Sequence, residues 1–362
     1  MSIDEVTTPT TAPFDPDKLM GFVFHAVDEV GATLNTALVV MGDKLGYYTA
    51  LAGSPLTATE LAERTGTAFP YAREWLNAQA AGHYLEYDPA TTRYTLPPEY
   101  AVALTDESSP AYLPGFFQIA LGTLGDAPRI FADAATADGL GWHQHSEDVH
   151  IGCERFFRPG YLANLVDSWL PALDGVVDKL NRGVSVADLG CGHGASTVLL
   201  AQAYPNSTFF GSDYHEASIL TARERAEQAG VSDRASFEAA SAATFAGSGY
   251  ALATTFDALH DMGDPIGAAR HVFSSLADDG TWMIVEPAAG DAVEDNLNPV
   301  GRAFYGFSTL LCTPASLSQA GAMALGTQAG PAKIREVVEA AGFTRFRIAA
   351  QTPFNNVFEV RK

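Results

Sequence analysis

The stretch Val186-Ala187-Asp188-Leu189-Gly190-Cys191-Gly192-His193-Gly194 decides the fold of this chain. The apolar residues up to Leu189 are typical of a buried strand, and the alternating glycines after it predict a tight turn into a helix. Glycine lets a backbone pass close beneath a ligand, and the N-terminus of the following helix offers free N–H groups to an anionic group. The stretch therefore predicts a ligand site at the carboxyl end of a strand.

The chemistry of that ligand follows from the spacing and from one acid. Gly-x-Gly-x-Gly differs from the Gly-x-Gly-x-x-Gly of pyrophosphate-binding turns, and Asp188 comes just before it. A carboxylate there repels phosphate and favours an ammonium group, so we expect a ligand with both a carboxylate and an amine, as in the methionyl end of S-adenosylmethionine. Asp213 lies 19 residues after Gly194, at the end of the next predicted strand. An acid at that place typically accepts hydrogen bonds from ribose hydroxyls.

The second half of the chain alternates predicted strands and helices. This rhythm predicts an α/β fold with a doubly wound, Rossmann-like parallel sheet over 181–362. Strands are expected at 184–189, 208–212, 251–256, 282–285 and 344–350, with helices up to Leu200 and over 217–229.

The first half predicts a separate, mostly helical domain over 18–110. Thr57 and Glu60 have the spacing of a capping box, and Gly66 should end that helix. A second helix is expected from Pro70 to Gly82, followed by two short strands at 83–87 and 93–96, which completes a winged helix. Around it we expect a mobile tail (1–17), two apolar helices over 19–52 broken near Gly42, and a helical linker and pocket lid (111–180) with glycine breaks.

Composition limits the class of function. The 362 residues have 21 basic and 43 acidic side chains, a net charge of −22, which opposes binding to phosphates or anionic lipid. The cysteines are far apart, and no segment approaches ~18 uninterrupted apolar residues or has the pattern of a signal peptide. We therefore expect a cytoplasmic protein that binds neither nucleic acid nor membrane.

These motifs together resemble the class I S-adenosylmethionine-dependent methyltransferases, and more narrowly the bacterial and mycobacterial members with an N-terminal winged helix, related to small-molecule O-methyltransferases. The resemblance covers nearly the whole chain after about Leu19. It depends on the turn at Gly190, the winged helix over 61–75, the run 256–262 (FDALHDM) and the closing strand ending at Arg361. It implies S-adenosylmethionine as cofactor, a small-molecule acceptor, and a homodimer formed through the helices of 19–52.

The resemblance also implies site residues, with two departures. Ser241 stands where the family usually has an aspartate for the adenine amino group, and Ala251 where the fourth strand often begins with an acid. We expect cofactor contacts from Asp188, Gly190, Gly192, Gly194, Asp213, Tyr214, Ser241, Phe256 and Asp257.

Catalysis requires a base only when the methyl acceptor is an acidic nucleophile, and histidine has a suitable pKa. The O-methyltransferases that the chain resembles place a catalytic histidine in a His-Asp-Trp sequence, and His260-Asp261-Met262 matches two of the three residues. Glu286, 26 residues further on, could hold the imidazole in the right tautomer. The alternative for His260 is a loop histidine bonded to a backbone carbonyl.

The acceptor pocket and a metal site are the remaining candidates. Aromatic residues suggest an apolar pocket, although plain core packing is the alternative for each: Trp142, Phe157, Tyr161 and Tyr305, with Cys312. The cluster His143, His145, His150 and Cys153 has no regular spacing that would aim four ligands at one point, so no metal is expected.

Three function classes stay open. The leading hypothesis is methyl transfer to a hydroxyl or other acidic nucleophile, and an N-, S- or C-methyltransferase that works by positioning alone is the alternative. The second class is a winged-helix transcription regulator, disfavoured by three arginines against five acids over 56–98. The third is a catalytically inactive cofactor-binding scaffold.

Overall fold

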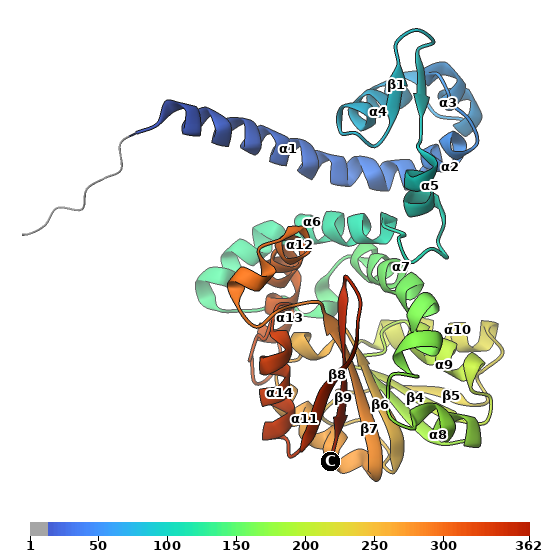
Figure 1. The fold of residues 1–362 in the computed structure, drawn as a ribbon, viewed down its shortest axis with the longest axis vertical. Helices are drawn as coiled ribbons and strands as arrows, with labels where there is room; N and C mark the ends of the chain where they lie inside the picture. Colours follow the sequence, from blue (N-terminus) through green and yellow to red (C-terminus); the bar gives the residue numbers. More distant parts are fainter. Residues whose placement is uncertain (1–13) are drawn as a thin grey trace, which may run out of the picture. The chain divides into compact units, whose positions relative to one another are not determined.

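A computed structural model describes residues 14–362, and these form two compact units that divide after Pro97 (Figure 1). The division comes before the expected boundary at 110. The helices of 111–180 therefore belong to the second unit and are not a linker between two others. The expected tail over 1–17 lies mostly outside the described residues, and helix α1 already begins at Pro16.

The first unit has the expected order of helix, helix and hairpin. The capping box is confirmed, because Thr57 N–H donates to Glu60 Oε2 at 2.8 Å and Glu60 N–H donates to Thr57 Oγ1 at 3.3 Å. The hairpin strands pair antiparallel, with Glu86 opposite Thr95. The elements are α1 (Pro16–Lys44), α2 (Tyr47–Ala52), α3 (Ala58–Thr65), α4 (Phe69–Ala81), β1 (Glu86–Asp88) and β2 (Arg93–Thr95).

The two predicted helices are confirmed, and the break between them lies at Leu45 and Gly46, just after Gly42. Gly46 has a φ of 70°, a left-handed conformation that favours glycine. Gly42 instead lies inside α1 against Trp75, where a Cβ would come within 2.4 Å of the indole. It permits close packing and does not end the helix.

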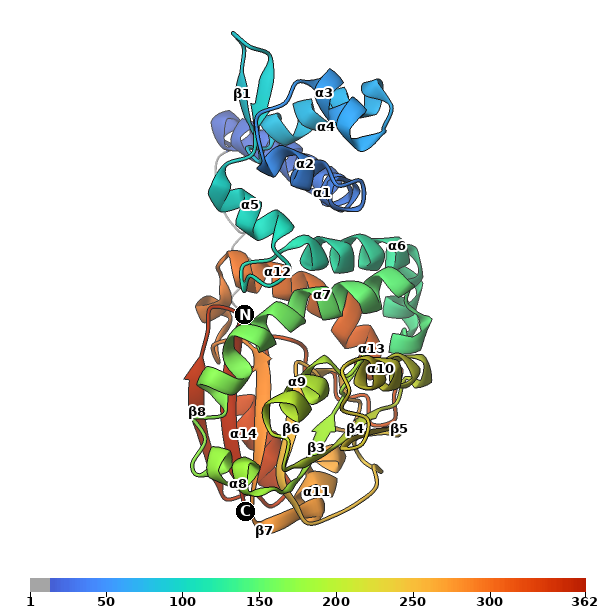
Figure 2. The ribbon, with the colours of Figure 1, turned by 90° about the vertical axis from the view of Figure 1, so that its right-hand side faces the viewer.

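Helices precede the sheet in the second unit. They are α5 (Pro98–Thr105), α6 (Pro114–Thr136), η1 (Trp142–Gln144), α7 (Glu147–Asn164), η2 (Leu165–Trp169) and α8 (Val176–Arg182). The longest of them are α6 and α7. Glycine breaks were expected over 111–142; Gly139 and Gly141 do lie in the break between α6 and η1, but the glycines inside α6 do not interrupt it. A Cβ at Gly115 would lie 2.6 Å from Phe156 N and one at Gly122 would lie 2.6 Å from Val149 Cγ2. These glycines let α6 and α7 pack closely side by side (Figure 2).

The sheet of this unit has seven strands in the order β5-β4-β3-β6-β7-β9-β8. All neighbours are parallel except at β9, which pairs antiparallel with both β7 and β8. The predicted strands are confirmed, but β5 was missed and the sheet is not wholly parallel. The strands are β3 (Ser185–Leu189), β4 (Thr208–Asp213), β5 (Ala235–Ala239), β6 (Tyr250–Phe256), β7 (Leu276–Pro287), β8 (Arg345–Gln351) and β9 (Asn355–Arg361).

Helices cover both faces of the sheet (Figures 1 and 2). Helices α8, α9 (Ala195–Ala203) and α10 (Glu216–Gln228) lie on one face, and α11 (Pro265–Ser275) and α14 (Gly330–Ala340) on the other. Other short elements follow β6 and β7: η3 (Leu259–Asp261), η4 (Val293–Asn296), α12 (Pro299–Phe307), η5 (Ser308–Cys312) and α13 (Thr313–Leu317).

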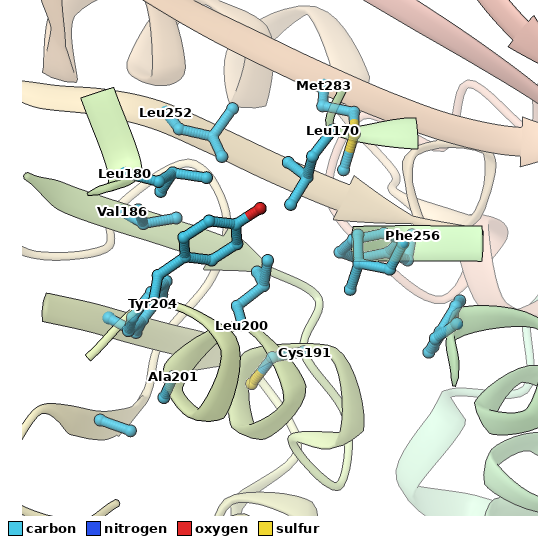
Figure 3. Close-up of a cluster of buried hydrophobic side chains, with 14 of the residues drawn as sticks. Leu170, Leu180, Val186, Cys191, Leu200, Ala201, Tyr204, Leu252, Phe256 and Met283 are labelled. Atoms are coloured by element: carbon cyan, nitrogen blue, oxygen red, sulfur yellow. The ribbon is translucent and has the colours of Figure 1, made fainter. Parts of the chain in front are cut away.

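Each face has its own apolar core because successive side chains of a strand point to opposite sides. Val186 packs with Leu180 and Leu200 in the cluster of Figure 3, whereas Ala187 and Leu189 belong to the cluster on the other face. Burying a leucine or valine side chain stabilises a fold by about 1.5–3 kcal/mol. The two clusters therefore hold β3 firmly, and with it the start of the glycine turn.

In the described part of the chain, residues 14–362, we find no helix with both the length and the apolar character that a membrane span requires.

Candidate active site

A cavity of about 590 Å³ lies beyond the carboxyl ends of β3, β4 and β6. The order of the sheet reverses here, since β4 lies on one side of β3 and β6 on the other, and such points bind ligands in open α/β sheets. Ten of the expected site residues line this cavity: Gly190, Gly192, Asp213, Tyr214, Ser241, Phe256, Asp257, Trp142, Phe157 and Tyr161.

The glycine turn forms the floor of the cavity at the end of β3. Gly190 and Gly192 have φ values of 70° and 50°, which side chains rarely adopt. At Gly190 a Cβ would also come within 2.7 Å of Ala258 Cβ, whereas at Gly192 the adjoining space is open. A side chain at either glycine would occupy the space above the turn. The turn therefore leaves room for a ligand in contact with its backbone. Gly194 does not line the cavity and instead packs against Ala222 and Phe237.

Asp213 connects the turn to β4. Its Oδ2 accepts from Gly192 N–H at 2.9 Å and its Oδ1 from His215 N–H at 2.8 Å. Burial raises the pKa of this carboxyl, while both backbone donors oppose the rise. A cavity-lining carboxylate at the end of the second strand is in the expected place for ribose hydroxyls.

Asp188 corrects an expectation. Its carboxylate is 1% exposed, does not line the cavity, and accepts from three hydroxyls. The donors are Ser196 and Thr197 at 2.7 and 2.5 Å on Oδ2, and Thr254 at 2.9 Å on Oδ1. The structure therefore does not support a direct contact between the Asp188 carboxylate and an ammonium group of the ligand. The residue ties β3 to α9 and β6 beneath the turn.

The far end of the cavity carries Tyr214 and the 240–243 loop. Ser241, which replaces the expected aspartate, lines the cavity, and its Oγ accepts from Ala243 N–H at 3.2 Å. The Tyr214 hydroxyl accepts from the backbone N–H of Trp142 at 3.0 Å. This bond attaches the segment between α6 and α7 to the end of β4.

One face of α7 forms the opposite wall. Phe157 and Tyr161 were expected in the pocket. The same face of the helix also carries three cavity residues that were not expected there, His150, Cys153 and Glu154. Their spacing of three and four residues is the signal that could have found them. Tyr305 and Cys312 do not line the cavity.

Two of the unexpected wall residues have close partners of their own. Glu154 pairs with Arg225 and, at 3.1 Å, with His193 Nδ1. Burial and the neighbouring His215 lower the pKa of His150 to about 4, so this ring is neutral near pH 7. The rings of His150 and His215 stack with their centres 4.8 Å apart.

His260 and Glu286 form a buried pair at the edge of the site. His260 Nδ1 lies 2.5 Å from Glu286 Oε2, and the other oxygen of Glu286 accepts from Leu259 N–H at 3.0 Å. Neither side chain lines the cavity, and His260 is only 3% exposed. Between its Nε2 and the cavity lies Asp261, whose Oδ1 is 3.3 Å from that nitrogen.

The charge state of His260 follows from these neighbours. Burial opposes protonation, but the carboxylates of Glu286 and Asp261 outweigh it and raise the pKa of His260 well above its usual range. The ring is thus an imidazolium near neutral pH. An imidazolium cannot accept a proton, so the expected role of His260 as a base depends on the ring first becoming neutral.

One group of possible metal ligands occurs among residues 14–362. It consists of His260, Asp261 and Cys312, whose ligand atoms lie within 4.8 Å of one another. The His260 ring already contacts two carboxylates there, those of Glu286 and Asp261. The histidine and cysteine cluster singled out in the sequence is not such a group in the described residues, because His145 pairs with Asp126 at 2.7 Å while His150 stacks on His215.

Comparison with known proteins supports this architecture. Residues 180–339 match the family described as a methyltransferase domain, and residues 33–106 match the Rv2258c-like winged HTH domain. Trans-aconitate 2-methyltransferase of Variovorax paradoxus is 36% identical over 110 residues, which are 30% of this chain. The chain thus spans only 40% of the length of that enzyme.

Solved structures show the same fold over nearly the full chain. A Nostoc punctiforme protein described as an O-methyltransferase has a TM-score of 0.72 at 20% identity, covering 97% of this chain and 100% of its own. Human N-acetylserotonin methyltransferase, solved with S-adenosylmethionine, has a TM-score of 0.67 at 16% identity, covering 98% and 99%. This chain therefore combines a methyltransferase domain with an N-terminal winged helix in the fold of these structures, and S-adenosylmethionine is the cofactor that this domain implies.

Proposed function

We propose that this chain transfers the methyl group of S-adenosylmethionine to a hydroxyl of a small, mostly apolar acceptor. The observation that carries the proposal is a continuous cavity of about 590 Å³ that has both the glycine turn and the aromatic wall of α7 in its lining. Such a volume lies within the range of small-molecule sites. An in-line methyl transfer needs the methyl donor and the acceptor in one space. Holding the reacting atoms about 3–3.5 Å apart lowers the activation barrier by several kcal/mol.

The cofactor end of the cavity offers suitable groups. The backbone at Gly190 and Gly192 and the start of α9 suit the methionyl carboxylate, Asp213 the ribose hydroxyls, and Ser241 the adenine edge. S-adenosylmethionine supplies the methyl group, which moves from its sulfur to the acceptor oxygen while the sulfur keeps the electron pair and the hydroxyl loses its proton. The aromatic rings of Phe157 and Tyr161 line the α7 wall of the same cavity and would keep water from the reacting atoms.

The finer part of the proposal is that His260 receives the hydroxyl proton on Nε2. Glu286 holds Nδ1, which leaves Nε2, 3.3 Å from Asp261 Oδ1, as the accepting nitrogen of the neutral ring. A cation bound in the cavity lowers the pKa of His260, because it opposes the second positive charge. The bound cofactor carries such a charge on its sulfonium, so a loaded site favours the neutral, accepting ring.

Two alternatives rest on specific observations. The burial of His260 favours an N-, S- or C-methyltransferase that works by positioning alone. The winged helix favours a regulator that senses the cofactor, although Arg73, the one arginine of α4, already pairs with Glu74 at 2.8 Å.

Binding and turnover together test the proposal. Calorimetry should show S-adenosylmethionine or S-adenosylhomocysteine binding without NAD binding, and a phenol panel with S-adenosylmethionine should yield methyl ethers. Cofactor binding without any turnover across phenols, amines and thiols would indicate a scaffold or sensor. Salt-dependent binding of duplex DNA would favour the regulator.

A further inference from the structure

The cavity wall lacks a cation for the carboxylate of the cofactor. The methionyl end of S-adenosylmethionine carries both an ammonium and a carboxylate group. Among the described residues, neither lysine nor arginine lines the cavity, whereas five carboxyl side chains do: Glu154, Asp213, Asp257, Asp261 and Asp264. The ammonium therefore has acceptors nearby, but the carboxylate meets like charges. It needs neutral donors, and the backbone N–H groups of the glycine turn supply them from one side only.

Two histidines line the cavity, and neither supplies the missing cation. His150 is neutral near pH 7, because burial and the neighbouring His215 lower its pKa to about 4. Burial also lowers the pKa of His193, whose Nδ1 already lies 3.1 Å from Glu154 Oε2. An anionic group in this cavity therefore depends on donors that carry no charge.

The hydroxyl groups of the wall are the next candidates. Five of them line the cavity, and four already have hydrogen-bond partners, those of Ser196, Tyr214, Ser218 and Ser241. The fifth belongs to Tyr161 and forms no hydrogen bond within residues 14–362. Its oxygen keeps accessible surface, although Tyr161 is only 8% exposed. Because Tyr161 lines the cavity, a bound molecule can reach this hydroxyl.

Aromatic neighbours hold the Tyr161 ring in one orientation. The ring stacks on Phe157 with their planes 9° apart, and its centre lies 5.0 Å from that of Phe256. Buried Trp169 packs against it edge-on, with the ring centres 6.2 Å apart. Aromatic pairs at such spacings stabilise a fold beyond the area that they bury. A side chain fixed in this way loses little further freedom when its hydroxyl binds a ligand.

The Tyr161 hydroxyl lies at the methionyl end of the cavity. It is close enough to Asp257 and Asp188 for both carboxylates, after burial, to raise the pKa of Tyr161 well above its usual range. Asp188 comes just before the glycine turn, and Asp257 precedes Ala258, whose Cβ would contact a Cβ at Gly190. The hydroxyl therefore stays protonated near neutral pH and is available as a donor beside the turn.

We propose that the Tyr161 hydroxyl donates a hydrogen bond to the methionyl carboxylate of the cofactor, opposite the backbone N–H groups of the glycine turn. The inference rests on the cofactor end of the proposed function and adds a binding residue from α7 to it. A hydrogen bond to an ionised acceptor is shorter and stronger than one between neutral groups. Because the carboxylate is then held from two sides, the sulfonium methyl keeps one direction towards the acceptor.

Two analogues of S-adenosylhomocysteine separate its charged groups. S-adenosyl-3-thiopropylamine lacks the carboxylate, and S-adenosyl-4-thiobutanoate lacks the ammonium. Calorimetry measures the Kd of all three ligands for the full chain and for Tyr161→Phe, which removes the hydroxyl and keeps the ring. Tyr161→Phe should bind S-adenosylhomocysteine and the thiobutanoate at least about tenfold more weakly than the wild type. The thiopropylamine should bind the two enzymes within about twofold.

Tyr204→Phe is the matched control. Tyr204 is a buried tyrosine of the same apolar cluster, and it does not line the cavity. This variant should keep the affinity of the wild type for all three ligands. Thermal unfolding verifies that both variants are folded.

Three results would overturn the inference: unchanged affinity for S-adenosylhomocysteine in Tyr161→Phe, an equal loss for the thiopropylamine, or a loss that disappears with the thiobutanoate. Failure of the wild type to bind S-adenosylhomocysteine refutes the cofactor site and the proposed function with it. The expected binding pattern without methylation of any phenol upholds the inference and refutes only the proposed transfer to a hydroxyl.

Discussion

His260 Nδ1 and Glu286 Oε2 lie 2.5 Å apart although 26 residues separate them in the chain. The pair joins the short helix after β6 to the end of β7, and Leu259 N–H occupies the second oxygen of Glu286. Both oxygens of the carboxylate therefore act on the loop that carries His260 and Asp261. Glu286 is a positioning residue for that loop, and the charge of His260 depends on it.

The pH dependence of methyl transfer should report this pair. A base must be neutral, and the pKa of His260 is raised above its ordinary 6.5, so kcat/KM for a phenol should rise with pH along a limb above 6.5. Glu286→Gln removes one of the charges that raise this pKa, and the limb should then move to lower pH. Identical pH profiles for the two enzymes would contradict the assignment.

Replacement of His260 should lower turnover without removing the cofactor. His260→Ala is expected to reduce kcat by ~10²–10⁴-fold, the usual effect of losing a positioned base. The loss should shrink at high pH, where the phenol ionises without help, and S-adenosylhomocysteine affinity should stay near normal. Retention of most of the rate at neutral pH would show that the enzyme works by positioning alone.

Gly192→Val should abolish cofactor binding by filling the space above the glycine turn. The position has a φ of 50° and faces open cavity space, so the side chain would occupy the place of the ligand. Gly230→Val is a matched control, because Gly230 has a φ of 67° and open space but lies after α10, away from the cavity. Calorimetry should show at least about tenfold weaker S-adenosylhomocysteine binding only in Gly192→Val. Equal affinity in the two variants would place the cofactor elsewhere.

Asp188→Ala should destabilise the second unit. Three buried hydroxyls would lose their shared acceptor, and at about 1 kcal/mol for each hydrogen bond the free energy of unfolding should fall by about 2–3 kcal/mol. Urea unfolding measures the loss, with exposed Asp278→Ala as the control. A variant as stable as the wild type would show that the hydroxyls find other partners at no cost.

Helix α1 should mediate formation of a homodimer. Its apolar side chains at three- and four-residue spacing include Val23, Val27, Val30 and Leu34, all exposed, with Val27 63% exposed. Exposed apolar stripes of this kind mark association surfaces. Light scattering should give about twice the 38.3 kDa monomer mass, and Val27→Glu combined with Val30→Glu should give the monomer. The neighbouring Asp28→Asn should leave the mass unchanged, and a monomeric wild type would contradict the prediction.

Local chemistry explains why much of the fold was predictable. The capping box at Thr57 and Glu60, the proline at the start of α4 and the run of apolar residues before Gly190 each depend only on neighbours in the chain. That α1 continues past Gly42 and α6 past Gly122 was not predictable. Both glycines lie inside helices because each packs closely against a residue distant in sequence, Trp75 and Val149.

For the site, the sequence by itself determined the glycine turn, Asp213 and the nearness of His260 and Glu286 to the ends of adjacent strands. These follow from the rule that parallel strands bring their carboxyl ends to one edge of the sheet. Only the tertiary structure decided which side chains face the cavity and in what charge state. It placed Asp188 beneath the turn and Asp261 between His260 and the cavity. The reason is physical. Tertiary packing sets where each side chain points and how exposed it is, and burial and the distances between charges set its pKa. No short stretch of sequence contains that packing.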